Sequence, residues 1–145
     1  MSHVEPRNAA RPFAGVIEQL RDAGLRPTRQ RLALARLLFE KGNRHVTAEL
    51  LHGEAQQTGV KVSLATVYNT LHQFTEAGLL REIVVDSSRS YFDTNRTEHH
   101  HFFHEVSGHL EDIPAEAIEV ARMPAPPGGL AVSRVDVIVR VRDQK

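Results

Sequence analysis

The chain has 145 residues, of which 41% are hydrophobic and 25% are charged, and its formal net charge is zero. This length and composition predict one or two small globular domains and exclude a disordered chain and a large barrel enzyme. Because the chain contains no cysteine, disulfides, thiolate zinc sites and cysteine nucleophiles are excluded as well.

Residues 12–78 predict four short helices. Apolar side chains recur there at spacings of three and four residues, which is typical of helices with one buried face. Pro12 opens the first helix, a Thr or Ser side chain caps each of the others, and a glycine ends every one. The predicted spans are 12–24, 28–42, 47–59 and 63–78.

After Gly78 the hydrophobic period changes from that of helices to that of strands. Residues 81–85 and 90–93 predict two strands joined by the polar turn 86–89. Helices followed by such a hairpin predict a winged helix-turn-helix. The helix before the hairpin would then enter the major groove of DNA.

The remaining residues predict a small α+β unit. Strands over 99–106 and 108–113 would meet at a Ser107-Gly108 turn, and Pro114 would open a short helix over 115–122. Alternating valines between Val135 and Val141 predict a further strand. Dimerisation would enlarge the thin core of so small a unit.

These elements predict an α+β fold with two domains. A winged-helix DNA-binding domain would occupy residues 1–94, with 1–11 as a flexible arm, and a sensing and dimerisation domain would occupy 95–145. No apolar run approaches the ~20 residues of a membrane span, and residues 1–11 lack the core of a secretory signal. We therefore expect a soluble, cytoplasmic protein that does not bind membranes.

The two halves differ in charge and in polar side chains. Residues 1–81 carry 11 Lys and Arg against 7 Asp and Glu, whereas residues 82–145 carry 7 against 11. Arg26, Arg29 and Arg31 surround the start of the second predicted helix, where arginines and helix amides favour phosphate. For any single polar residue of the fourth predicted helix, a solvated helix face is the simpler interpretation. Together with the hairpin they predict DNA binding.

Four histidines within residues 98–105 are the strongest local signal. On a strand, His99 and His101 would share one face and His100 would lie on the other. Two imidazoles at i and i+2 can share a metal ion, whereas His104 lies about 13 Å along the strand from His100. Imidazoles beside carboxylates suit Fe(II), Mn(II) or Zn(II). An ordinary surface strand without a metal is the alternative.

Enzyme chemistry fits these residues less well. Residues 101–105 read His-Phe-Phe-His-Glu rather than the His-Glu-x-x-His of zinc proteases, and no motif for an activated nucleophile or a phosphate-binding loop occurs. We therefore expect no enzymatic activity. A metal-handling protein without specific DNA binding and a zinc hydrolase are the competing hypotheses.

Longer motifs resemble a known family. The segments RPTRQR (26–31), HVTA (45–48), LATVYNTL (64–71) and YFD (91–93), followed by the histidine run, resemble the ferric uptake regulator superfamily over residues 12–140. The resemblance implies a winged helix followed by an α+β dimerisation domain. It also implies a metal-responsive homodimer that binds a partly palindromic operator in double-stranded DNA.

The resemblance assigns roles to residues of both predicted domains. His45 would begin the third predicted helix, so that a ligand there could set the angle between the domains. The implied metal ligands are His45, Asp93, His99, His101 and Asp112. Candidates for a second metal site or for haem are His100, His104 and Glu119. In the family the residue at Arg26 tends to enter the minor groove, and the pair Tyr68-Asn69 contacts bases. The predicted DNA-binding residues are Arg26, Thr28, Arg29, Arg31, Ser63, Thr66, Tyr68 and Asn69.

Departures from the family pattern narrow the implied chemistry. Many members hold a structural zinc with two Cys-x-x-Cys pairs, and this chain has no cysteine for such a site. The triple histidine without those cysteines looks most like the iron response regulator branch. Members of that branch control iron and haem genes, act on DNA when iron is scarce and lose activity when haem is available. The implied cofactors are therefore an iron or manganese ion, haem, or both. Direct sensing of Fe(II), Mn(II) or peroxide is the alternative.

Overall fold

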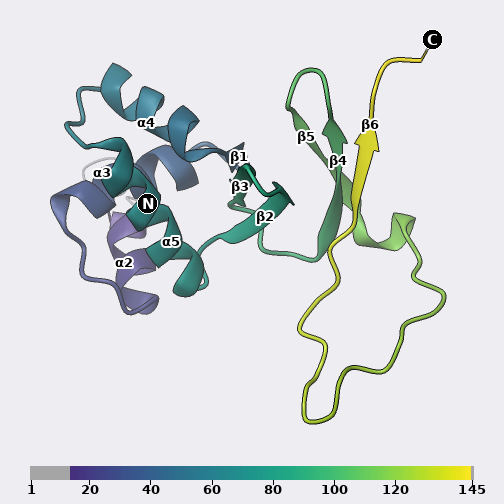
Figure 1. The fold of residues 1–145 in the computed structure, drawn as a ribbon. Helices are drawn as coiled ribbons and strands as arrows, with labels where there is room; N and C mark the ends of the chain where they lie inside the picture. Colours follow the sequence, from purple (N-terminus) through teal and green to yellow (C-terminus); the bar gives the residue numbers. More distant parts are fainter. Residues whose placement is uncertain (1–13, 145) are drawn as a thin grey trace, which may run out of the picture. The chain divides into compact units, whose positions relative to one another are not determined.

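Four helices form the first part of the computed structural model, which describes residues 14–144 (Figure 1). They are α2 (Ala14–Asp22), α3 (Arg29–Phe39), α4 (Ala48–Gln57) and α5 (Leu64–Glu76). Each lies within one of the four spans predicted from the apolar spacing, so these predictions are confirmed. The predicted arm 1–11 and the first two residues of the first predicted helix lie outside the described residues.

The helix boundaries follow from local hydrogen bonds. The side chains of Thr28, Thr47 and Ser63 accept hydrogen bonds from backbone N–H groups in the first turns of α3, α4 and α5. Such caps satisfy amides that have no partner within the helix. After α5 the chain reverses at Gly78, whose φ of 83° favours glycine.

The helices enclose the main hydrophobic core. Leu20, Leu38, Leu51 and Leu71 come from α2, α3, α4 and α5 respectively, and each is fully buried. Phe74 lies among them, with its ring centroid 6.2 Å from that of Phe39. The apolar spacing read from the sequence therefore identifies the faces that pack together.

A small sheet follows the helices and differs from the predicted hairpin. The strands β2 (Arg81–Asp86) and β3 (Arg89–Asp93) are antiparallel, and the short strand β1 (His45–Val46) pairs with the other edge of β3. His45 therefore lies on a strand, and its predicted position at the start of a helix is wrong. A two-residue strand depends on a partner far along the chain, so local pattern gives no sign of it.

The turn between β2 and β3 is held by Asp86. Its carboxylate accepts a hydrogen bond from the N–H of Ser88 at 2.9 Å and one from Nη2 of Arg89 at 2.9 Å. The hydrogen bonds from Ser88 and Arg89 hold the pKa of Asp86 well below its ordinary value of 3.8. The turn residue is therefore ionised at neutral pH.

A second sheet is built from β4 (His99–His104), β5 (Leu110–Pro114) and β6 (Ile138–Val141) in the order β5-β4-β6. β5 is antiparallel and β6 parallel to the central strand. The predicted helix over 115–122 shrinks to the 3₁₀ turn η1 (Ala115–Ala117), and the strand predicted from Val135 begins only at Ile138. A long irregular segment connects η1 with β6 (Figure 1).

The chain divides into two units between Arg96 and Thr97. The first contains the helices and the sheet β1-β3-β2, and the second contains the sheet β5-β4-β6. We refer to them below as the first and the second domain. Across residues 14–144, none of the helices has the length and apolar character needed to cross a membrane.

Candidate metal centre and nucleic-acid interface

Strand β4 places two histidines of the second domain on one buried face. His99 and His101 are 5% and 2% exposed, whereas His100 between them is half-buried. The imidazole centroids of His99 and His101 lie 4.6 Å apart. The alternation of a strand thus brings these two rings together and turns His100 away from them.

A carboxylate from the neighbouring strand faces both rings. Asp112 on β5 is paired with His101 across the ladder. Its Oδ1 lies 3.4 Å from Nε2 of His99 and 3.5 Å from Nε2 of His101. Two imidazole nitrogens and one carboxylate oxygen therefore converge on one point.

The hydrogen bond at the back of His99 selects the ring nitrogen that can bind a metal. Nδ1 of His99 lies 2.6 Å from the carbonyl oxygen of Thr97. A carbonyl only accepts hydrogen bonds, so Nδ1 carries the proton and Nε2 keeps its lone pair. A histidine that binds a metal through one ring nitrogen usually donates such a hydrogen bond from the other, which fixes the orientation of the ring.

The donor set fits a divalent cation. The candidate ligand atoms of His99, His101 and Asp112 all lie within 4.8 Å of one another. Ligands bound at about 2.1 Å from a common ion lie at most about 4.2 Å apart, and the separations of 3.4 and 3.5 Å between Asp112 and the two imidazoles fall within this limit. Imidazole with carboxylate suits Fe(II), Mn(II) and Zn(II). We call these three residues the histidine cluster.

The first domain contains a second imidazole–carboxylate pair. His45 on β1 and Asp93 on β3 face each other across the ladder, and Nε2 of His45 lies 3.3 Å from Oδ2 of Asp93. Asp93 is only 1% exposed, and its Oδ1 accepts a hydrogen bond from the N–H of Asn95 at 2.8 Å. The pairing of β1 with β3, which the sequence did not predict, creates this arrangement.

The candidates for a second site are dispersed. Nδ1 of His100 accepts a hydrogen bond from the N–H of Val137 at 3.1 Å, so the proton of the neutral ring lies on Nε2. Nε2 of His104 lies 3.0 Å from Oε1 of Glu111. Glu119 is exposed in the irregular segment after η1. Within residues 14–144, none of the three candidates belongs to a group of three close ligand atoms.

The predicted DNA-binding residues gather mainly around one polar cavity of the first domain. This cavity, of about 520 Å³, lies between the start of α3 and the exposed face of α5. Five of the eight predicted residues line it: Arg26, Thr28, Arg31, Thr66 and Asn69.

The other three predicted residues do not line that cavity, and Arg29 lines another cavity of the first domain. Ser63 caps α5, and Arg29 is exposed on the first turn of α3. Tyr68 is 44% exposed, and its ring packs 4.9 Å from that of His72 and edge-on to Phe92 at 6.4 Å. The rings of His72 and Phe92 hold one side of Tyr68, and the exposed remainder of its side chain can contact a ligand.

Three residues of the same cavity, Gln30, Thr70 and Gln73, were not among the predicted DNA-binding residues. Thr70 and Gln73 line it together with Thr66 and Asn69. These four positions follow the spacing i, i+3, i+4 and i+7, which marks one face of a helix. This helical spacing in the sequence could have placed Thr70 and Gln73 on the same face as Thr66 and Asn69.

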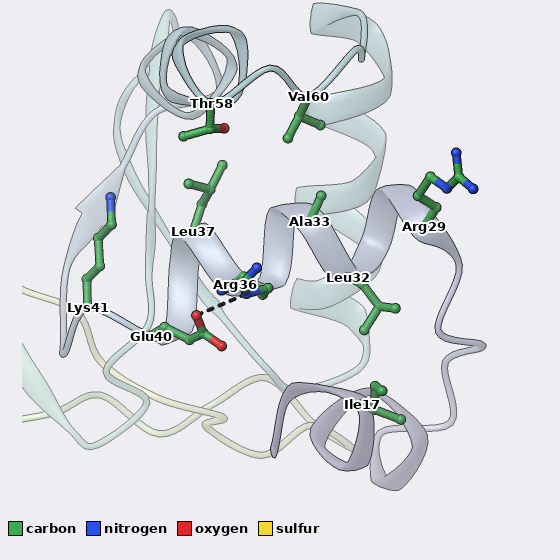
Figure 2. Close-up of a pocket in the computed structure, with 10 residues that line it drawn as sticks. All are labelled: Ile17, Arg29, Leu32, Ala33, Arg36, Leu37, Glu40, Lys41, Thr58 and Val60. Carbon is green, nitrogen blue, oxygen red and sulfur yellow. Dashed lines mark hydrogen bonds and ion pairs between the residues drawn. The ribbon is translucent and has the colours of Figure 1, made fainter. Parts of the chain in front are cut away.

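Another cavity lies elsewhere in the first domain. It has a volume of about 710 Å³ and is lined by apolar side chains, including Ile17 of α2 and Leu32 and Leu37 of α3, and by charged ones (Figure 2). An ion pair of 3.1 Å between Arg36 and Glu40 crosses its edge. None of its lining residues is a candidate metal ligand.

Comparisons with known proteins show the family of the chain. The model of the ferric uptake regulator family matches residues 22–130. The ferric uptake regulation protein of Legionella pneumophila is 36% identical over 103 residues, which cover 70% of this chain and 76% of that protein. The peroxide-responsive repressor PerR of Staphylococcus aureus is 35% identical over 97 residues, covering 67% of this chain and 65% of the repressor.

A solved structure shows the same fold. The ferric uptake regulator of Pseudomonas aeruginosa with manganese has a TM-score of 0.68 and 27% sequence identity. The similarity covers 88% of this chain and 97% of that one. Since the family model matches most of the described residues and the fold is shared as well, the chain belongs to the ferric uptake regulator family.

Proposed function

We propose that this protein is an iron-responsive transcription regulator that binds a divalent metal ion and a double-stranded DNA operator. The observation that carries the proposal is the histidine cluster, where two buried imidazoles and a carboxylate converge. Burying two imidazoles costs free energy unless their ring nitrogens have a hydrogen-bond partner or a metal ion to bind. A bound Fe(II) or Mn(II) would supply the positive charge that this donor set lacks.

The same ion would also bind the pair in the first domain. His45 and Asp93 have the same donor chemistry as the cluster and correspond to metal ligands in the family resemblance. With five ligands from two domains, the site would accommodate an ion that prefers nitrogen and oxygen at coordination numbers above four. The occupied site would then hold the DNA-binding domain in one orientation, which is how it would bias DNA affinity.

The DNA interface we propose is centred on α5. Asn69 and Thr66 would face base edges, with Tyr68 beside them, and Arg26 would contact the minor groove or phosphates. Arg29, exposed on the first turn of α3, would add a phosphate contact. A homodimer would place two such helices on the half-sites of a partly palindromic operator.

Haem is a second candidate signal. The triple histidine and the missing cysteines support a place in the iron response regulator branch, where haem availability controls activity. His100 would bind the haem iron after it releases the hydrogen bond that it accepts from the N–H of Val137. The similarity to a peroxide-responsive repressor supports a third signal, oxidation at a bound iron.

Calorimetric titration of the metal-free protein with Mn(II) tests the shared site. We expect one ion per chain, and we expect His45→Ala and His99→Ala each to weaken binding at least about tenfold. His52→Ala, which changes a histidine of α4 bonded to the carbonyl of Val62, is the matched control. Two ions per chain, or an affinity that is insensitive to His45→Ala, would contradict a site shared between the domains.

A further inference from the structure

The side chain of Arg31 joins three parts of the first domain. Nε and Nη2 donate hydrogen bonds to Oε1 of Gln73 on α5, at 3.3 and 3.1 Å. Nη1 donates to the carbonyl oxygen of Arg26, in the loop before α3, at 2.9 Å. One guanidinium on the first turn of α3 thus holds both the loop and α5.

These hydrogen bonds use three of the five N–H donors of the side chain. A guanidinium has five N–H donors in a rigid plane. In Arg31, each of the three nitrogens already donates one hydrogen bond within the domain. Neighbouring Arg29, two residues earlier on the same helix, is exposed and its guanidinium points away from the helix (Figure 2). Two arginines in one turn therefore occupy different environments.

Resting on the DNA-binding function proposed above, we infer that Arg31 is a positioning residue for sequence reading and not a phosphate contact. Arg26 and Asn69 line the same cavity, one from the loop and one from α5. The bonds of Arg31 fix the separation between that loop and that helix. Groups held in place before DNA arrives lose less conformational freedom on binding, so they discriminate better between sequences.

Charge and geometry can be separated by the choice of substitution. Arg31→Lys keeps the positive charge but loses the planar fork that reaches Gln73 and Arg26 together. Gln73→Ala removes the acceptor on α5 and changes no charge. Arg29→Gln removes an exposed charge without touching these hydrogen bonds, so it is the matched control.

Fluorescence anisotropy of the full chain measures both effects. The probes are the duplex that the wild-type protein selects from a random-sequence library and a shuffled duplex of equal composition. Both are titrated over a range of salt concentrations, with or without Mn(II), whichever gives tighter wild-type binding. We expect Arg31→Lys and Gln73→Ala each to reduce the affinity ratio of the two duplexes about tenfold.

The salt dependence of the affinity should separate Arg29→Gln from the other two variants. Arg31→Lys and Gln73→Ala should keep the wild-type slope of affinity against salt, whereas Arg29→Gln should lower it by about 0.9 and keep the affinity ratio. The double variant Arg31→Lys with Gln73→Ala should lose no more than Arg31→Lys alone, because Arg31→Lys already removes both hydrogen bonds to Gln73.

Two results would overturn the inference. The first would contradict only the role of Arg31, and the second would contradict the proposed DNA-binding function as well. A wild-type preference that survives Arg31→Lys and Gln73→Ala would contradict the role of Arg31 alone. A wild-type protein that binds both duplexes equally in every metal state would contradict the proposed function and the role of Arg31 with it. Thermal unfolding of each variant ensures that only folded protein is compared.

Discussion

The protonation of individual histidines decides which of them can bind a metal. His99 faces a carbonyl oxygen with Nδ1, and His100 faces an N–H with Nδ1. Neighbouring residues of one strand therefore carry their proton on opposite ring nitrogens. Only the first arrangement leaves a lone pair on Nε2, which in His99 faces Asp112.

Nitrogen NMR of the metal-free protein tests this difference. We expect the neutral ring of His99 to be protonated at Nδ1 and that of His100 at Nε2, because a carbonyl accepts and an amide donates. The same Nε2 proton on both rings would contradict the assignment of His99 as a preset ligand.

Asp112 is the residue that links the two imidazoles. We expect Asp112→Asn to weaken Mn(II) binding at least about tenfold, because the amide retains the shape but not the negative charge. Glu111→Gln is the control, since Glu111 is the adjacent carboxylate of β5 but interacts with His104. Titration calorimetry compares the two, and equal losses would assign the effect to overall charge.

At the scale of the helix, capping of α5 supports the proposed reading surface. Oγ of Ser63 accepts a hydrogen bond from the N–H of Thr66 at 3.1 Å. We expect Ser63→Ala to lower the free energy of unfolding by about 1 kcal/mol, because an amide of the first turn loses its partner. Denaturant unfolding measures the change. A wild-type midpoint would show that the cap contributes nothing.

Elements with strong local signals were predictable from the sequence. Thr28, Thr47 and Ser63 mark helix starts, and the apolar spacing marks the buried faces, so α2 to α5 could be placed. The alternation along β4 likewise places His99 and His101 on one face.

Elements that depend on distant partners were not predictable. β1 exists only through its pairing with β3, and with it the contact between His45 and Asp93. The helix predicted over 115–122 has favourable residues, but Val120 is 47% exposed. A short helix whose apolar side chains find no partner is marginal. Beyond η1 the chain therefore stays irregular.

At the scale of the whole molecule, exposed apolar side chains favour a homodimer. Leu130 and Val132, in the irregular segment before β6, are 66% and 51% exposed. Exposed apolar side chains that lie together on a surface mark interaction sites. A second copy of the chain is the partner that the family resemblance implies.

Sedimentation of the full chain tests the dimer. We expect twice the chain mass of 16.2 kDa for the wild-type protein and the monomer mass for Leu130→Asp combined with Val132→Asp. The control is Val84→Asp, which places a charge at a 59% exposed valine on β2 of the first domain. Identical masses for all three proteins would exclude this segment from the interface.

We expect occupation of the histidine cluster to change the affinity of the protein for DNA. The direct measurement is anisotropy of the selected duplex with the chelated protein and with Fe(II), Mn(II) or haem added. We predict a change of about 5- to 150-fold with at least one of them, and loss of that change in the variant with His99→Ala and His101→Ala. Stronger binding with an ion would support direct metal sensing, and weaker binding with haem would support the haem-responsive branch. An affinity that none of the three changes, or a response that survives the double substitution, would contradict the account.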